Sequence, residues 1–476
     1  MQDQGSIRPA TRTEHDLIGD REVPAAAYWG IHSLRAVENF PMTGRTIADM
    51  PDLIRALAAI KLAAARTNGE LGLLPPRVAG AIAEAAREIY NGALHDAFVI
   101  DPIQGGAGTS TNMNANEVIA NRALELLGEA RGNYRVVHPN EHVNLGQSTN
   151  DVYPTGLKLA AWSGVQRLWA AMDELRIAFA ARQTNFADVL KMGRTQLQDA
   201  VPMTLGQEFG AFARMLSEDQ ERLSEAAELI CEINLGGTAI GTGIASHVRF
   251  GPLVRENLAE ITGVPLVTAH DLVEATQDCG AFVQLSGVLK RIAVKLSKVC
   301  NDLRLLSSGP RAGFNEINLP ARQAGSSIMP GKVNPVIPEV VNQVAFEVVG
   351  NDVTVTMAAE AGQLQLNAFE PVIFHAIHSS LSQLTAACKT LEKNCVAGIT
   401  ANRDLLKKQV ENSTGIVTAL NPVIGYHTAT EVAVEAHLSG RRVGDVVLER
   451  GLMTKAELDF ALRVEALTAP SQVTPD

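Results

Sequence analysis

Long stretches of the chain place apolar residues three and four positions apart, which is the spacing of one buried helical face. Between Thr204 and about Ile233 this spacing joins Leu205, Phe209, Phe212, Leu216, Leu223, Ala227 and Ile230. Between Phe282 and Leu306 it joins Leu285, Val288, Ile292, Leu296, Val299 and Leu303. Residues 157–186 and 336–363 form two more long, mostly apolar stretches. Helices of this length with near-heptad spacing predict a long helical bundle.

Shorter periodic segments come before the long ones. Residues 52–68 and 76–91 predict two helices, and residues 111–128 predict a third. The first two are each followed by a glycine, Gly69 or Gly92, of the kind that ends helices in a left-handed conformation.

Two sequence signals mark the starts of further helices. Thr204 with Gln207, and Thr454 with Glu457, have the spacing of a capping box, in which two side chains satisfy each other's backbone N–H groups. The residues up to about Thr46 show little periodicity and several turn formers, so we expect an extended N-terminal segment.

The stretch 336–363 is apolar on more than one helical face. A helix that is hydrophobic all round must be covered on all sides, and one chain offers too few long helices to do so. We therefore expect a homo-oligomer with a shared helical core. The fold class predicted is all-α, with an N-terminal helical domain (1–148), a central long-helix bundle (149–402) and a small C-terminal helical domain (403–476).

Composition narrows the function. With 476 residues, 46% hydrophobic content and only 4% aromatic content, the chain suits helices packed through aliphatic faces. A net charge of −11 argues against nucleic acid as a partner. The five cysteines are scattered without CxxC spacing, so neither disulfides nor a structural zinc site are indicated. No secretory signal and no membrane-spanning apolar run are visible, so we expect a cytoplasmic protein.

Four segments rich in hydroxyl and amide side chains suggest where the chemistry lies. They comprise residues 105–112, 147–151, 193–199 and 326–334, and each precedes a long predicted helix. Helix N-termini expose unpaired N–H groups at the positive end of the dipole, so four converging ends would form a pocket for an anion. The alternative is that each segment only caps its own helix, since Ser, Thr, Asn and Asp are the usual cap residues.

Two other patterns give weaker signals. The glycines of residues 105–108 lack the Gly-Lys-Ser/Thr ending and the preceding strand of a phosphate-binding loop. His375 and His378 have a spacing that could hold a metal, but no carboxylate lies nearby at ligand spacing. We therefore expect no metal and no cofactor, and interpret these histidines as packed or solvated.

The loop Gly-Ser-Ser-Ile-Met-Pro-Gly-Lys-Val-Asn-Pro at residues 325–335 resembles the signature of the fumarase/aspartase superfamily. Residues 108–114, 147–151 and 193–202 also resemble this family, and the resemblance runs from about Arg12 to Leu467. It implies a three-domain all-α chain assembled as a homotetramer, whose long helices share one bundle. It also implies active sites built from segments of three subunits.

Within the superfamily the chain resembles aspartases more than fumarases. Fumarases typically carry His where this chain has Gln196, and Ser where it has Thr149. The stretches 22–40 and 334–343 are also similar to aspartases, whereas His138-Pro-Asn140 resembles a fumarase segment. The alternatives are a fumarate hydratase, or a structural protein that keeps the lyase scaffold without catalysis.

The resemblance implies the reversible conversion of L-aspartate to fumarate and ammonium, begun by loss of a Cβ proton and passing through an aci-carboxylate. Donors to the developing dianion are implied at Thr109, Ser148, Thr149 and Ser327. Residues that hold the α-carboxylate are implied at Thr195, Lys332 and Asn334. Asn150 would meet the amino group, and Ser326 would be the general base, which needs N–H groups and a cation nearby.

Overall fold

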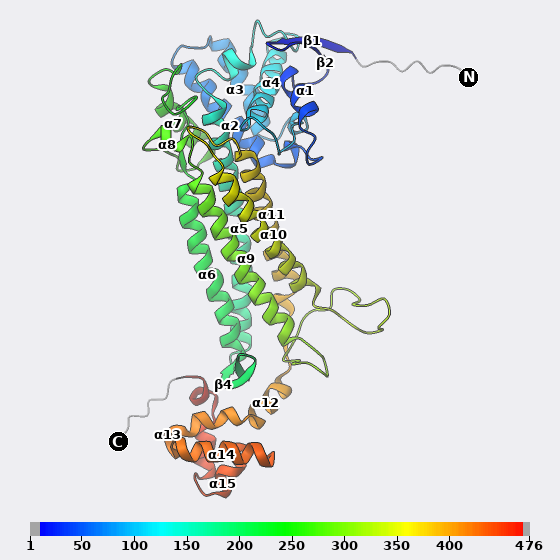
Figure 1. The fold of residues 1–476 in the computed structure, drawn as a ribbon, viewed down its shortest axis with the longest axis vertical. Coiled ribbons are helices and arrows are strands. Elements are labelled where there is room, and N and C mark those ends of the chain that lie inside the picture. Colours follow the sequence, from blue (N-terminus) through cyan, green and yellow to red (C-terminus); the bar gives the residue numbers. More distant parts are fainter. Residues whose placement is uncertain (1–9, 470–476) are drawn as a thin grey trace, which may run out of the picture. The chain divides into compact units, whose positions relative to one another are not determined.

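The computed structural model describes residues 10–469, in which helices dominate and the strands form four short two-stranded sheets (Figure 1). The all-α prediction is confirmed. Contacts divide the chain into two compact units. Within the described residues, unit 1 comprises residues 10–169, 221–291 and 347–383, and unit 2 comprises residues 170–220, 292–346 and 384–469. The three-domain division with boundaries after residues 148 and 402 stays a prediction.

The N-terminal segment of unit 1 is more regular than expected. It forms an antiparallel hairpin of β1 (Thr11–Asp16) and β2 (Gly19–Pro24), followed by α1 (Ile31–Asn39). The expectation of an extended segment is therefore wrong for α1. The start of α1 is held by a distant buried carboxylate: Glu117 accepts hydrogen bonds from the N–H groups of Gly30 (2.9 Å) and His32 (2.8 Å). Such a cap comes from another helix, so local periodicity does not reveal it.

The three shorter predicted helices are confirmed as α2 (Pro51–Glu70), α3 (Pro76–Tyr90) and α4 (Thr109–Leu126). Gly92 has the left-handed φ of +107° expected of a cap, whereas Gly69 lies inside α2. Unit 1 also contains one further helix that packs on α2, a parallel strand pair and a single helical turn. These are α7 (Phe250–Thr262), β5 (Glu232–Ile233) with β6 (Val267–Thr268), and α8 (Leu272–Ala275).

Five long helices have residues in both units. They are α5 (Thr149–Asn185), α6 (Leu205–Leu229), α9 (Gly280–Leu306), α10 (Val336–Glu360) and α11 (Glu370–Asn394). Four of them confirm the long apolar stretches, although α5 starts well before residue 157. The sequence pattern did not predict α11. Thr204 and Gln207 form the expected reciprocal capping bonds at the start of α6, both 3.0 Å long.

Within each unit the long helices are joined by packing and by buried polar bonds. In unit 1, Asp352 of α10 accepts bonds from Ser286 (2.9 Å) and Lys290 (2.5 Å) of α9. In unit 2, the ring of Phe179 on α5 packs against those of Phe209 and Phe212 on α6, with centroids 6.1 and 5.6 Å apart. Aromatic contacts at this distance stabilise a core beyond the burial of their area.

The rest of unit 2 consists of small elements. A hairpin of β3 (Leu190–Thr195) and β4 (Gln198–Thr204) precedes α6, and β7 (Ile317–Asn318) pairs with β8 (Thr400–Ala401). The C-terminal helices are α12 (Arg403–Asn412), α13 (Asn421–Ile424), α14 (Tyr426–Ser439), α15 (Val443–Glu449), α16 (Lys455–Ala461) and α17 (Val464–Thr468). They surround a small aliphatic core that includes Leu420, Val432 and Val446. The capping box of Thr454 and Glu457 at α16 is confirmed.

None of the helices in residues 10–469 combines the length and the apolar character needed to cross a bilayer.

Glu370, at the start of α11 in unit 1, is a carboxyl group with only 5% of its surface exposed. Burial raises the pKa of Glu370 to about 8, and the charge of Lys158 partly offsets this rise. Lys158 itself donates to the backbone oxygen of Glu232 at 2.6 Å. At neutral pH the folded protein therefore holds Glu370 mainly protonated.

Replacing Glu370 by Gln should remove a pH-dependent loss of stability. Because the pKa of Glu370 is higher in the folded state than its ordinary 4.5, its contribution is complete below pH 4.5 and is lost as pH rises through about 8. Between these values the free energy of unfolding of the wild-type protein should fall relative to Glu370→Gln by about 1.4 kcal/mol per pH unit.

Urea denaturation at a series of pH values measures this difference. The control is Glu256→Gln, which changes a side chain that is 62% exposed and should follow the wild-type curve. Parallel curves for the wild-type and Glu370→Gln proteins would contradict the assignment of a raised pKa.

Candidate active site

The first polar segment ends at a glycine that no other residue could replace without strain. Gly108 has φ +83°, and a Cβ atom there would lie 2.3 Å from Cδ1 of the Tyr153 ring. Thr109 follows as the first residue of α4, and its hydroxyl donates to the oxygen of Gly106 at 2.7 Å. The close approach of α4 to Tyr153 thus fixes where Thr109 lies.

The second segment forms the start of α5. The hydroxyl of Ser148 accepts the N–H of Asn150 (3.3 Å), and Asp151 accepts the N–H of Ser148 (2.9 Å). Asp151 is fully buried and its other oxygen accepts the N–H groups of Gly236 and Thr238, both at 3.0 Å. Burial raises the pKa of Asp151 to about 6, although these hydrogen bonds favour its charged form. The capping interpretation therefore holds for Ser148.

A buried amide cluster lies beneath this helix start. The side chain of Lys61 on α2 has no exposed surface, and its Nζ donates to Asn144 Oδ1 and Gln147 Oε1, both at 2.9 Å. Asn112 Nδ2 donates both to Asn144 Oδ1 (3.2 Å) and to Thr149 Oγ1 (3.1 Å). Burial lowers the pKa of Lys61 to about 7, and the charge of Asp151 partly offsets this shift. Sequence reasoning missed Lys61, although a lysine within an apolar helical stretch is a usable signal.

Asn150 contributes in a different way. Its Nδ2 donates to the backbone oxygen of Ala239 at 2.7 Å, and its backbone oxygen accepts from Asn234 at 2.9 Å. The side-chain amide is therefore held by its nitrogen, which leaves Oδ1 as the atom able to accept a bond from a ligand.

The third polar segment is not the helix N-terminus that was expected. Residues 193–199 lie in the β3–β4 hairpin, where Thr195 pairs with Gln198 across a two-residue turn. The turn residues Gln196 and Leu197 have φ +54° and +63°, which is the backbone of a type I′ turn. Thr195 and Gln196 are exposed at the hairpin tip, so the anion-binding geometry of a helix end is absent here.

Ion pairs anchor the base of this hairpin. Glu316 is completely buried, forms a salt bridge with Lys191 at 2.8 Å, and accepts a hydrogen bond from Arg194. The guanidinium of Arg194 also lies 4.4 Å from the centre of the Phe314 ring. Because Arg194 precedes Thr195, these contacts fix the strand that carries it. Glu316 was not singled out from the sequence and lies in no motif.

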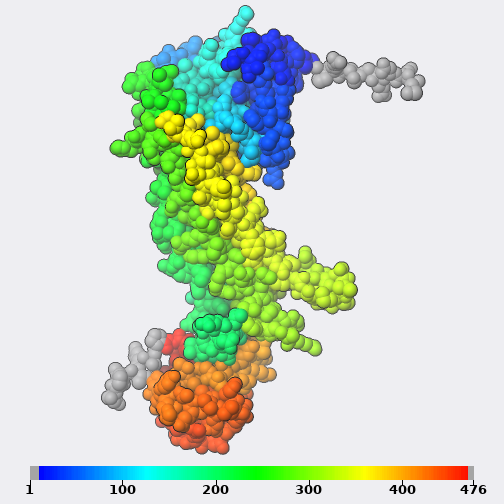
Figure 2. All heavy atoms as spheres, viewed as in Figure 1, coloured from blue at the N-terminus to red at the C-terminus, as the bar shows by residue number. Residues whose placement is uncertain are grey.

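The fourth segment, residues 325–335, is a loop that projects from the helices of unit 2 (Figures 1 and 2). Its neck is closed by the N–H of Gly325, which donates to the oxygen of Lys332 at 2.7 Å. Asn334 Nδ2 donates to the oxygen of Gly325 at 2.7 Å. Within the loop, Ser326 Oγ accepts the N–H groups of Ile328 (3.1 Å) and Met329 (2.9 Å).

The predicted site residues thus form two groups. Unit 1 holds Thr109, Ser148, Thr149 and Asn150, and unit 2 holds Thr195, Ser326, Ser327, Lys332 and Asn334. Ser148, Thr149 and Asn150 are consecutive at the start of α5. Ser327 and Lys332 are exposed, and Lys332 forms no ion pair with any residue between 10 and 469. Their roles stay predictions.

Other candidate residues belong to separate features. His375 and His378 line a small cavity of about 170 Å³ in unit 1 with Arg45 and Asp49. In the described part of the chain no three His, Cys, Asp or Glu side chains are grouped to hold a metal. All five cysteines are free and buried. His138 caps the turn that follows it, since its Nδ1 accepts the N–H groups of Asn140 and Glu141.

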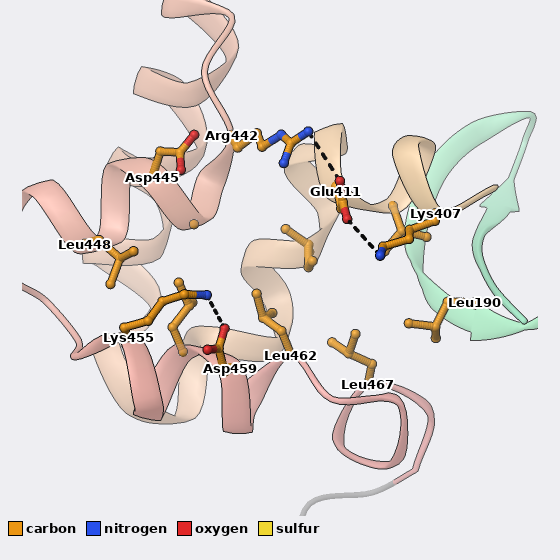
Figure 3. Close-up of a pocket in the computed structure, with 14 residues that line it drawn as sticks. Leu190, Lys407, Glu411, Arg442, Asp445, Leu448, Lys455, Asp459, Leu462 and Leu467 are labelled. Carbon is orange, nitrogen blue, oxygen red and sulfur yellow. Dashed lines mark hydrogen bonds and ion pairs between the residues drawn. The ribbon is translucent and has the colours of Figure 1, made fainter. Parts of the chain in front are cut away.

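A larger cavity of about 390 Å³ lies within the C-terminal helices of unit 2 (Figure 3). Leucines such as Leu448 and Leu462 line it, and most of its charged side chains pair with one another. Arg442 lies 3.3 Å from Glu411, and Lys455 pairs with Asp459. None of the predicted site residues borders this cavity, and all of its charged side chains except Asp445 are paired with one another.

The all-α fold with its long helices is that of a lyase of the fumarase/aspartase type. A lyase family model matches residues 19–350, and a fumarase C C-terminus model matches residues 416–469. Among solved structures, a fumarate lyase:delta crystallin from Brucella melitensis bound to cobalt superposes with a TM-score of 0.93 at 54% identity, covering 95% of this chain and 98% of that chain.

Among curated relatives, aspartate ammonia-lyase of Escherichia coli (strain K12) is 56% identical over 97% of this chain and 96% of its own length. That of Pseudomonas fluorescens is 59% identical over 97% of both chains. The chain belongs to the aspartate ammonia-lyase family.

Substituting Gly108 by Ala should destabilise unit 1. The added methyl group would overlap the Tyr153 ring and occupy a left-handed backbone, so we expect a loss of about 2–5 kcal/mol in the free energy of unfolding. Gly80 in α3 is the matched control because a Cβ there meets nothing within 4 Å. Gly80→Ala should gain up to about 1 kcal/mol. Chemical denaturation compares the two, and equal stabilities would show that Gly108 does not determine this contact.

Proposed function

We propose that this protein catalyses the reversible deamination of L-aspartate to fumarate and ammonium. The observation that carries the proposal is the identity of 56–59% to aspartate ammonia-lyases along nearly the whole of both chains. The arrangement of the serine loop and of the α5 start supports it, because the reaction needs a base and donors to a developing dianion.

The difficult step is removal of a proton from the carbon beside the β-carboxylate. The electron pair moves onto that carboxylate and gives an aci-carboxylate with two negative oxygens. The protonated amine then leaves from the neighbouring carbon as ammonia, which takes up the proton removed from Cβ, through the base or solvent, to become ammonium. Preorganised donors lower the barrier because they stabilise charge that is fully developed only after proton removal. We assign this task to the hydroxyls of Thr109, Ser148, Thr149 and Ser327, of which that of Thr109 must first turn away from the oxygen of Gly106.

Ser326 is the proposed base. A serine hydroxyl has a high pKa, so its oxyanion requires stabilisation before it can take a proton from carbon. Two backbone N–H groups, from Ile328 and Met329, already donate to its Oγ. Lys332, in the same loop, supplies a positive charge with no partner of its own among the residues described. The two N–H groups favour the charged form of Ser326, and we assign the charge of Lys332 to the same task.

The remaining roles concern the other end of the substrate. Thr195, Lys332 and Asn334 would hold the α-carboxylate, and Asn150 Oδ1 would accept a bond from the amino group. Because the amino group is already protonated when the C–N bond breaks, it leaves as neutral ammonia, and no acid is required at position 196, where Gln196 stands in place of the histidine of fumarases. His138 is the observation that favours a fumarate hydratase instead. Fumarate absorbance produced from aspartate, compared with that from malate, distinguishes the two.

We also infer a cytoplasmic homotetramer with a shared helical core and active sites built from several subunits. Helix α10 exposes Val340, Phe346, Val353 and Met357, with exposed fractions of 44–68%. Apolar surface of this kind is covered in obligate oligomers. Completion of the site by neighbouring subunits fits the division of its residues between two units, and the three domains bounded after residues 148 and 402 remain part of the proposal.

Ser326→Ala should lower kcat for aspartate by about 10²–10⁴-fold, because the base is lost while the loop backbone is retained. The initial rate of fumarate formation measures the effect. Ser307→Ala, which alters a serine at the end of α9, is the matched control and should retain activity. An active Ser326→Ala enzyme would contradict the proposed mechanism.

Phe346→Lys should dissociate the assembly, since it introduces a charge into the exposed apolar face of α10. Sedimentation velocity should show a fall from the wild-type mass to smaller species. Phe460→Lys changes a side chain of similar exposure (62%, against 67% for Phe346) on α16 and should leave the mass unchanged. A monomeric wild-type protein would disprove the tetramer.

A further inference from the structure

Lys61 is an unusual residue for its place in the fold. It is a fully buried lysine whose ammonium donates only to neutral amide oxygens, those of Asn144 and Gln147. No ion pair joins it to a carboxylate among residues 10–469, although the charge of Asp151 acts on it from a greater distance. Burying a charge without a direct counter-ion is unfavourable for folding, so packing alone does not explain a lysine here.

The ammonium determines how the neighbouring amides are oriented. Because an ammonium group only donates, the atom of Asn144 that faces Lys61 must be its oxygen. Asn112 and Asn116 both lie 3.2 Å from that same oxygen, so each must present its NH₂ group to it. Their own side-chain oxygens are left buried without a partner, which is a sign that the orientation is imposed.

The orientation of the Asn112 amide affects Thr149, a residue of the proposed site. The second N–H of Asn112 donates to Thr149 Oγ1 at 3.1 Å. Thr149 therefore accepts from the protein interior, and its own hydroxyl proton points elsewhere, where none of residues 10–469 accepts it. An anion bound at the α5 start would accept a hydrogen bond from the Thr149 hydroxyl.

We propose that Lys61, Asn144 and Asn112 are positioning residues that fix the Thr149 hydroxyl as a hydrogen-bond donor to the substrate carboxylate. This inference rests on the proposed function, because it assigns a direction to one of the donors invoked there. It adds that the direction is set by a charge in α2, through two amides, and not by Thr149 itself. If the side-chain amide of Asn112 were flipped, its oxygen would face Thr149. The Thr149 hydroxyl would then donate to Asn112, and the developing dianion would lose a hydrogen bond.

Asn112→Asp tests this directly. The substituted carboxylate has the shape of the amide but cannot donate, so Thr149 must donate to it. We expect kcat/KM for aspartate to fall about 10–100-fold, mainly through kcat, because the lost bond is strongest in the transition state. Asn116→Asp is the matched control: it places the same charge beside Asn144, but Asn116 does not contact Thr149.

A double-mutant cycle separates positioning from general damage. On a Thr149→Val background Asn112→Asp should cause little further loss, whereas Asn116→Asp should cause the same loss as on the wild-type background. Independent effects of Asn112→Asp and Thr149→Val would overturn the inference. If Asn112→Asp does not fold, Asn112→Leu replaces it in the cycle with the same expectation, and additivity there would equally overturn it.

Calorimetric titration with fumarate keeps the two proposals distinguishable. If the wild-type protein binds fumarate but does not act on aspartate, the proposed function fails, and the cycle is then read in binding constants with the same criteria. A wild-type protein that binds no dicarboxylate would overturn both.

Discussion

A polar group buried among helices must be given a hydrogen-bond partner, and this constraint organises the structure more than any single apolar contact does. Asp151 joins the start of α5 to the loop at residues 236–238, and Glu117 holds the start of α1. Glu316 fixes the base of the β3–β4 hairpin. Each of these carboxylates is buried, and each links segments that are distant in the sequence. Two of these carboxylates, Asp151 and Glu316, therefore position elements that carry predicted site residues.

The sequence revealed the elements whose signals are local. Apolar periodicity predicted α2, α3, α4, α6, α9 and α10 closely, because each helix buries a continuous face. Both capping boxes were also found, since their partners are three residues apart. By contrast, α1 is held by Glu117 from α4, and nothing between residues 31 and 39 reveals that partner. Long-range capping of this kind has no periodicity to detect.

In the candidate site, too, local motifs were visible in the sequence and long-range contacts were not. Motifs identified Thr149, Ser326 and Lys332 as individual residues, but they did not identify what holds them. The bond from Asn112 to Thr149 joins two helices, and Lys61 acts through a third. The segment at residues 193–199 was assigned to a helix start because its hydroxyl and amide residues are the same types that cap helices. The same residue types cap helices and form turns, so only the observed strand pairing shows that this segment is a hairpin.

The hairpin tip also bears on how enzymes of this superfamily diverge. Gln196 has a left-handed backbone with φ +54°, a conformation that β-branched residues avoid and that histidine accepts comparatively well. An exchange between glutamine and histidine at this position therefore leaves the turn intact and needs no compensating change in β3 or β4. The turn therefore accepts either residue while the scaffold stays the same.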